Sequence, residues 1–312
     1  MSKVPTLSDI LGLSYDLLPQ ESQLLLITSV LGTSPSWLAY SLLYNTLTSD
    51  SPVVFVSFSN DYTYFRDGAK RHGLDLASYL KKGNFVFVDG FSKLFLPTGA
   101  QSGPTWTPSI IPSPRGGIQP RGVPAPPRQQ PLQAPSSSSS TDPIKYISFG
   151  PTPTIADSLK QLEAIKAAIK SLPVTPAKPR LILEGLEVLM SAGGVEVGSI
   201  EDLIYDLREI TSTAAIIMPS DSALIQTSES STILELSHAN LVVSLGHVAD
   251  AILSLRLLDT GVAKDISGVL KVTRGAGNLP RDSRTGVIEE KEMLYYEGDG
   301  GVKIFARGAG GH

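Results

Sequence analysis

Short apolar runs alternate with helical patterns in the first third of the chain, and this alternation limits the possible folds more than any other feature. Apolar runs occupy Leu24–Thr28, Val53–Ser57 and Asn84–Asp89, and helical patterns lie between them at Ser36–Leu47 and Asp61–Leu80. Strands that alternate with helices form a parallel sheet with helices on its faces. The first part of the chain therefore predicts an α/β fold.

The second half continues this alternation and then changes. Helices are expected at Ile155–Leu172 and Ser199–Thr211, and strands at Arg180–Glu184, Ala214–Met218 and Asn240–Leu245. The last part predicts antiparallel strands, because short runs follow one another without helices and Gly298-Asp-Gly-Gly301 is a hairpin signal. These strands are expected at Ala251–Leu258, Gly268–Thr273, Met293–Glu297 and Gly301–Ala306.

A segment of different composition separates the two halves. Pro97–Pro143 holds 12 of the 23 prolines and a run of five serines, Ser136–Ser140. Such a segment cannot bury enough apolar surface to offset its ordering entropy, so we expect a disordered insertion. Two domains joined by a linker is the alternative, but the first half alone offers only three strands. We therefore favour a single domain over residues 1–312, interrupted at 97–143.

Composition excludes several classes of protein. The chain has 312 residues, a formal net charge of −4 and no cysteine. Disulfides, thiolate nucleophiles and cysteine metal sites are therefore ruled out, and a protein that binds nucleic acid over its whole surface is disfavoured. No signal-peptide pattern and no apolar run of about 18 residues is present. We expect a soluble, intracellular protein with no membrane partner.

The segment after the first strand has the frame of a phosphate-binding loop without its functional residues. In G-x-x-x-x-G-K-[ST], backbone N–H groups and the Lys hold phosphates and the hydroxyl holds Mg²⁺. Counted from Gly32, Trp37 replaces the second Gly, Leu38 the Lys and Ala39 the Ser/Thr. The simpler interpretation is an ordinary strand–turn–helix with Thr33 or Ser34 as N-cap and Pro35 in the first turn. On either interpretation Gly32, Trp37, Leu38 and Ala39 form a non-functional loop.

No other motif predicts catalysis. Glu184 ends an apolar strand, where nucleotide-hydrolysing enzymes place a metal-binding or water-positioning acid, but an acid at a solvated strand end is the commoner case and the one we favour. No G-x-S-x-G or H-E-x-x-H is present, and His238 and His247, expected at the ends of a strand, suit structural roles better than metal binding. We predict no catalytic residue, no metal and no cofactor.

Charge is distributed unevenly along the chain. Between Leu181 and Leu255, Arg208 is the one basic residue against eleven acids, and the segments Leu186–Ser199 and Ser220–Ala239 contain no Lys or Arg. Phosphate contacts would therefore come from later arginines or from the insertion. Solvated loop charges are the alternative, which we favour. The candidate residues are Arg274, Arg281 and Arg284, with Arg115, Arg121 and Arg128 in the insertion.

The closing segments GVLKVTRGAGNLPRD and EMLYYEGDGGVKIFARG resemble the final strands of RecA/KaiC-type ATPases. Together with LILEGLEVLMSAGG and the run from Val242 to Gly275, they are similar to the Elongator complex protein six family of RecA-like accessory subunits. The resemblance covers Ile144–Arg307 well and Leu7–Phe95 loosely. It implies a RecA-like core with a mostly parallel twisted sheet, helices on both faces, antiparallel C-terminal strands and no functional Walker A loop.

The resemblance also implies a function. The family contributes a non-catalytic subunit to a hetero-hexameric ring with two other RecA-like Elongator subunits. The ring binds tRNA and supports a separate catalytic subcomplex in wobble-uridine (U34) modification, in the cytoplasm with the nucleus as a second compartment. An ATPase with a non-standard or composite nucleotide site is the alternative, and an autonomous RNA-binding module is a third. Lys271 and Arg274 are three residues apart, so a paired phosphate role would require a bulge in their strand.

Overall fold

The structure is a computed structural model that describes residues 23–96 and 144–306, together with Pro5 and Ile10. Gaps within these ranges fall at 152–153, 174, 176–177, 260–262, 278–287 and 299–300. The predicted insertion Pro97–Pro143 and the candidate residues Arg281 and Arg284 lie outside the described residues.

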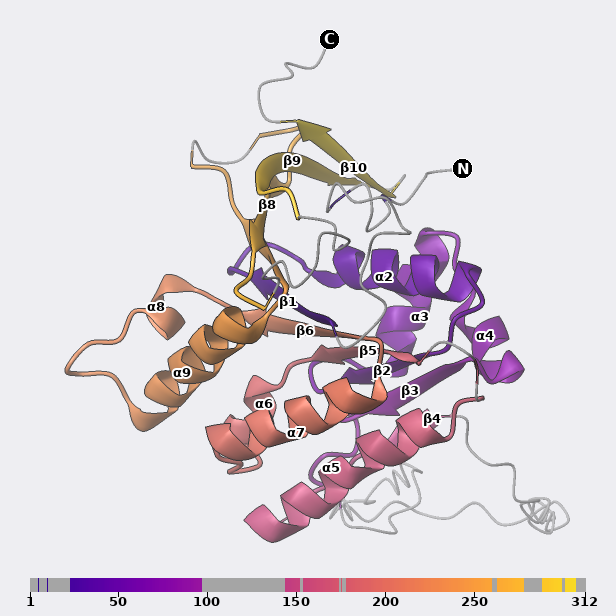
Figure 1. Cartoon of the computed structure of the whole chain (residues 1–312). Helices are drawn as coiled ribbons and strands as arrows, with labels where there is room; N and C mark the ends of the chain where they lie inside the picture. Colours follow the sequence, from indigo (N-terminus) through magenta and orange to yellow (C-terminus); the bar gives the residue numbers. More distant parts are fainter. Residues whose placement is uncertain are drawn as a thin grey trace, which may run out of the picture. The chain divides into compact units, whose positions relative to one another are not determined.

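The described strands form one sheet in the order β10-β9-β8-β7-β1-β6-β5-β2-β3-β4 (Figure 1). Pairing is parallel from β7 through β1 to β4 and antiparallel from β7 through β8 and β9 to β10. Strands on both sides of residues 97–143 are interleaved, because β5 pairs with β2. The strands are β1 (Gln23–Ser29), β2 (Val53–Ser57), β3 (Phe85–Asp89), β4 (Ile144–Tyr146), β5 (Arg180–Glu184), β6 (Thr213–Pro219), β7 (Ala251–Arg256), β8 (Gly268–Arg274), β9 (Lys291–Gly298) and β10 (Gly301–Ala306).

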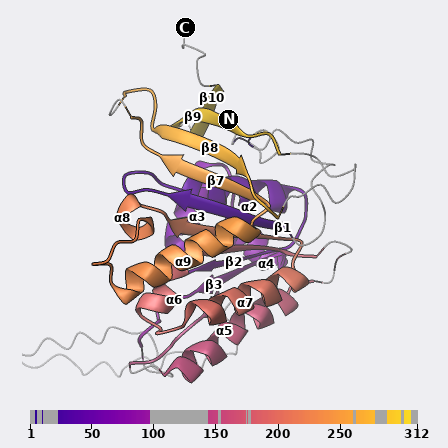
Figure 2. The same ribbon diagram turned by 60° about the vertical axis from the view of Figure 1, so that its left-hand side comes forward.

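Helices cover both faces of the sheet (Figure 2). Helices α2, α3 and α4 pack on one face, and α5, α6, α7 and α9 pack on the other. The helices are α2 (Ser36–Thr48), α3 (Tyr62–Arg71), α4 (Leu76–Lys82), α5 (Ile155–Lys170), α6 (Glu187–Ser191), α7 (Val197–Ile210), α8 (Ser222–Ile225) and α9 (Ile233–Val248). In the part of the chain that is described, no helix combines the length and the hydrophobicity needed to cross a bilayer.

The core consists of two apolar clusters, one on each face of the sheet. Strand β2 shows how they arise, because successive side chains of a strand point to opposite faces. Val53 and Phe55 lie in the cluster beneath α2 and α3, and Val54 and Val56 lie in the cluster beneath α5 and α7. Such continuous apolar strands are expected where a parallel sheet is covered on both sides.

The predicted α/β architecture is confirmed, but three element predictions were wrong. Asn240–Leu245, predicted as a strand, lies inside α9, because a short apolar run fits a buried helix as well as a strand. Asp61–Leu80 is two helices, since Gly73 has φ +80° and the Asp75 carboxylate caps α4. Strand β7 is antiparallel only to β8; on its other side it is parallel to β1.

Candidate functional site

The turn after β1 is closed by Thr33. The Thr33 N–H donates to the Val30 carbonyl at 3.0 Å, and the Thr33 hydroxyl donates to the same oxygen at 2.7 Å. Gly32 has φ +91°, which a side chain would strain. Helix α2 starts at Ser36 with Pro35 as N-cap and no side-chain cap hydrogen bond, so the predicted capping by Thr33 or Ser34 was wrong.

The three positions that would carry the second Gly, the Lys and the hydroxyl of a phosphate loop lie in the protein core. Trp37 and Ala39 are fully buried and Leu38 is 1 % exposed. The Trp37 ring lies 5.3 Å from the Tyr295 ring of β9. These side chains therefore attach the first turn of α2 to the sheet, and none of them points to a solvent-accessible phosphate position.

An acidic side chain already binds a backbone N–H group of the turn. Asp221, at the N-cap position of α8, accepts a hydrogen bond of 2.7 Å from the Leu31 N–H. In a phosphate loop such N–H groups bind the anionic ligand. Here the Asp221 carboxylate takes one of them and adds negative charge beside the turn. The Leu31 side chain is 85 % exposed.

Glu184 holds the loop after β2 in place. Its Oε2 accepts a hydrogen bond of 2.7 Å from the Ser57 hydroxyl, whose oxygen in turn accepts from the N–H groups of Ser59 and Asn60. Burial raises the pKa of Glu184, against the opposing effect of side-chain hydrogen bonds from Ser57 and Asn60. Hydrogen bonds through Ser57 thus connect the ends of β5 and β2. Glu184 is 6 % exposed, so the expectation of an acid at a solvated strand end was wrong.

Glu187 lies one turn beyond, at the start of α6. Burial, with a smaller contribution from the nearby Glu184, raises its pKa to about 7 against the opposing effect of a backbone hydrogen bond. Its Oε2 atom is buried without a hydrogen-bond partner. In the described part of the chain, no group of three or more His, Asp or Glu side chains is arranged to hold a metal.

The cationic candidates are separated in the structure. Strand β8 pairs without interruption with β7 and β9, so no bulge intervenes and Lys271 and Arg274 leave opposite faces of the strand. Both are exposed. The Arg274 N–H donates to Glu290 Oε1 at 3.0 Å, which places an acid next to the candidate phosphate contact.

Both histidines expected at strand ends lie on α9 instead. His238 is buried, and its Nε2 lies 3.0 Å from the Pro219 carbonyl. His247 is exposed in the last turn of the helix. The expectation that they flank a strand was wrong for the same reason as the strand itself.

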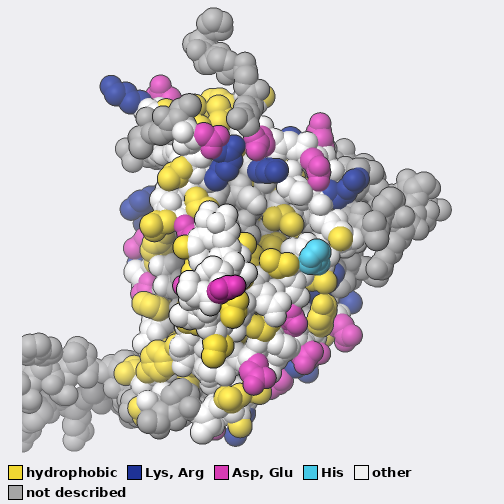
Figure 3. Space-filling model, turned by 90° about the vertical axis from the view of Figure 1, so that its left-hand side faces the viewer, with side chains coloured by type: hydrophobic (Ala, Val, Ile, Leu, Met, Phe, Trp, Pro, Cys, Tyr) yellow, Lys and Arg dark blue, Asp and Glu magenta, His cyan; other side chains and the backbone are white. Residues whose placement is uncertain are grey.

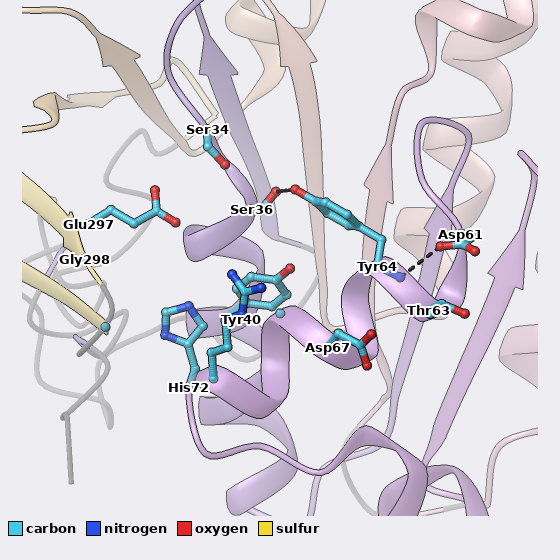
Figure 4. Close-up of a pocket in the computed structure, with 13 residues that line it drawn as sticks. Ser34, Ser36, Tyr40, Asp61, Thr63, Tyr64, Asp67, His72, Glu297 and Gly298 are labelled. Atoms are coloured by element: carbon cyan, nitrogen blue, oxygen red, sulfur yellow. Dashed lines mark hydrogen bonds between the residues drawn. The ribbon is translucent and has the colours of Figure 1, made fainter.

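A cavity of about 740 Å³ lies between the start of α2, helix α3 and the β9–β10 hairpin (Figure 4). The Ser36 and Tyr64 hydroxyls are 3.1 Å apart at its edge. Burial raises the pKa of Glu297 and lowers the pKa of His72. With Arg71 also in its wall, the cavity can receive a polar group of either charge. Its residues come from three separate segments, so no spacing in the sequence could have revealed it.

Comparisons with a family model and with a solved structure identify the fold. The family model described as "ATPase: KaiC" matches residues 4–101. A KaiC-like protein from Pyrococcus horikoshii superimposes with a TM-score of 0.55 and 14 % identity, over 97 % of both chains. The fold is that of the KaiC-like RecA group.

Curated relatives cover nearly the whole chain. "Elongator complex protein 6 homolog" of Schizosaccharomyces pombe is 23 % identical over 296 residues, 93 % of this chain and 94 % of the relative. "Elongator complex protein 6" of Xenopus laevis is 25 % identical over 305 residues, 97 % of both chains. The chain is similar to Elongator complex protein 6 along its length. This likeness is consistent with the family indicated by Val242–Gly275.

Sequence reasoning missed Asp221 and Ser57. The one available signal for Asp221 was its place two residues after a strand that ends at the carboxyl edge of the sheet, where β1 also ends. Ser57 carried no signal of its own, because its role depends on the pairing of β2 with β5.

Proposed function

We propose that this chain is a non-catalytic structural and regulatory subunit of an Elongator complex. The observation that carries the proposal is the similarity to two proteins named Elongator complex protein 6 over at least 93 % of the chain. A shared fold alone would not support it, because one fold hosts many functions.

We propose further that the chain does not bind ATP through the turn after β1. Three features support this: Leu38 lies in the core where a Lys would be needed, Trp37 packs on Tyr295, and Asp221 binds the Leu31 N–H. The alternative is an ATPase with a composite site shared with a neighbouring subunit. One feature supports this alternative: the segment from β1 to α2 has the strand–turn–helix arrangement of a phosphate-binding loop.

In the proposed assembly the chain joins two other RecA-like Elongator subunits in a hetero-hexameric ring. The ring binds tRNA and supports the catalytic subcomplex in U34 modification, in the cytoplasm and also in the nucleus. Any phosphate contact made by this chain would come through Arg274, Arg281 and Arg284, for which solvated loop charges are the alternative. The acids of Leu186–Ser199 and Ser220–Ala239 repel a phosphate backbone, so the other subunits would supply the remaining contacts.

Two measurements test assembly and nucleotide binding. Co-expression with the two RecA-like subunits, followed by native mass measurement, should give a hexamer; a chain that stays monomeric contradicts the proposal. Calorimetric titration of the isolated chain with ATP·Mg²⁺ should show no binding. Affinity tighter than about 100 μM, roughly −5.5 kcal/mol, favours the ATPase alternative.

Binding of tRNA tests the arginines. At about 0.15 M salt, where exposed charges are strongly screened, the isolated chain should have negligible affinity for tRNA. In the ring, changing Arg274, Arg281 and Arg284 together to Ala should weaken binding and flatten its salt dependence by up to about three phosphate contacts. The matched control changes three lysines of α3 and α4, Lys70, Lys81 and Lys82, to Ala. Equal slopes in both variants would identify the arginines as solvated loop charges.

A further inference from the structure

Helix α9 has an outward face without charged residues. Its residues repeat every three or four positions and are all exposed: Ile233, Leu236, Asn240, Val243 and His247. Positions with this spacing lie along one side of a helix. We call these five residues the α9 stripe. Ile233 is 84 % exposed and Val243 is 48 % exposed.

The opposite side of α9 packs on the sheet. Ala239, Leu241, Val242 and Leu245 are buried there, against β-strand residues of the same cluster. A surface helix normally carries charges on its solvent side, and a helix that is hydrophobic all round is normally buried. Glu235 is the one charged residue among the sixteen of α9, and the capping box with Thr232 engages it. The composition of α9 is therefore that of a helix with protein on both sides.

More exposed apolar side chains lie at the same edge of the sheet. Leu31 follows β1, Leu257 follows β7, and α9 begins at this carboxyl edge with Ile233. Leu257 lies beside the turn, because a Cβ built on Gly32 would be 3.3 Å from its side chain. Clusters of exposed apolar residues mark interaction surfaces.

The charges around the stripe indicate what covers it. Between Arg208 and Arg256 the chain has no Lys or Arg, and Arg208 itself is 3.7 Å from Asp250. Glu229 is exposed in the loop before α9, and Asp221 lies beside the turn. Figure 3 looks onto this side of the molecule, where hydrophobic and uncharged surface occupies the centre and most Lys and Arg lie toward the edges. Lys264 lines a hollow with Gly32 and Leu257 at this edge, but α9 and the loop before it carry acids and no Lys or Arg. A protein surface with apolar residues inside a basic rim matches the apolar stripe and its acids better than RNA does.

We propose that the α9 stripe is the docking surface for a neighbouring RecA-like protein chain, which presents apolar residues surrounded by Lys or Arg. The inference rests on the proposed function, because it assigns one of the two ring contacts of this subunit. Apolar burial would supply affinity, and the acidic surroundings would select the partner and its orientation.

The test uses the full-length chain co-expressed with the two RecA-like subunits. Val243→Asp places a charge in the stripe at an exposed site, where it should not unfold the chain. The matched control is Ile155→Asp on α5, because Ile155 is 50 % exposed. Val243→Asp should weaken association with one of the two subunits at least tenfold, while Ile155→Asp leaves it unchanged and both variants keep the wild-type melting temperature. Glu229→Lys should weaken the same contact more than Glu229→Gln, with the difference shrinking at high salt.

Each other outcome overturns the inference. If the wild-type chain assembles and Val243→Asp assembles equally well, the α9 stripe is not the contact but the proposed function stands. A wild-type chain that joins neither subunit removes the proposed function as well. Self-association that Val243→Asp abolishes would identify a second copy as the occupant. A ring that stays intact but loses tRNA affinity would identify RNA.

Discussion

Leu38 gives the sharpest test of the claim that the position where a phosphate loop carries Lys lies in the core of this protein. Leu38 is 1 % exposed, whereas Leu31 in the preceding turn is 85 % exposed. The same change, Leu→Ala, therefore removes the same atoms from the core at one site and from solvent at the other. Burial predicts a loss of about 2–5 kcal/mol of unfolding free energy for Leu38→Ala and about 0.5 kcal/mol or less for Leu31→Ala.

Urea denaturation followed by circular dichroism measures both values. The slopes of unfolding free energy against urea should match, so that the midpoints report stability. Trp37 is less suitable for this comparison, because its buried Nε1 has no hydrogen-bond partner and its removal would mix lost packing with a relieved polar group. Equal losses for the two leucine variants would refute the assignment of Leu38 to the core.

Restoring the loop extends the same reasoning. Changing Trp37 to Gly, Leu38 to Lys and Ala39 to Thr removes an aromatic core residue and places an ammonium group in an apolar site. Loss of a buried Trp alone costs about 3–5 kcal/mol, a large part of the 5–15 kcal/mol typical of a domain. We expect a strongly destabilised protein without ATPase activity. Appreciable turnover with an unchanged melting temperature would contradict this.

Three further predictions concern single residues, and a fourth concerns the segment Pro97–Pro143. Glu187→Gln should flatten the pH dependence of the unfolding free energy. Burial raises the pKa of Glu187 to about 7 from 4.5, so the wild-type stability is complete below about pH 4.5 and falls by at most about 3 kcal/mol as pH rises through 7. Parallel urea curves at pH 5 and 8 for both proteins test this. Glu184→Ala should cost about 1–3 kcal/mol by leaving Ser57 without its acceptor, and Mg²⁺ should not raise the wild-type melting temperature, as it would for a metal ligand. Gly32→Ala should cost about 1–2 kcal/mol because φ is +91°, whereas Gly198→Ala on α7, with open space around it, should be neutral or stabilising. Replacement of Pro97–Pro143 by a short Gly/Ser linker should leave melting and assembly nearly unchanged, since closure entropy varies slowly with length; loss of soluble protein would show that the segment contributes to the fold.

Local patterns predicted most of the sheet but not the elements around its carboxyl edge. Strands such as Val53–Ser57 and Arg180–Glu184 were recognisable because both faces of a covered parallel sheet demand apolar residues. The apolar run in α9 misled for the same reason: both of its sides are apolar, so the helical period that separates core from solvent is missing. The capping box of Thr232 and Glu235 was the one available sign of a helix start.

For the candidate site, too, some features could be predicted from the sequence and others could not. Substitution of the loop residues at Trp37, Leu38 and Ala39 could be read directly from spacing, because a phosphate loop is a local motif. The Asp221 contact with Leu31 could not, since it joins residues 190 positions apart. The same holds for Ser57 and Glu184, which are neighbours only because β5 pairs with β2. Residue spacing reveals local motifs, whereas contacts across a sheet require the strand order.

The structure also shows which protein contacts hold the frame of the loop. A phosphate loop needs open space at the start of its helix, but here that first turn supplies three core residues and a ring contact with β9. The turn itself is held by Thr33 from within and by Asp221 from α8. Protein groups therefore hold both the turn and the start of α2 in place. On the proposed function, stability and nucleotide binding would therefore compete for the atoms of this first helical turn.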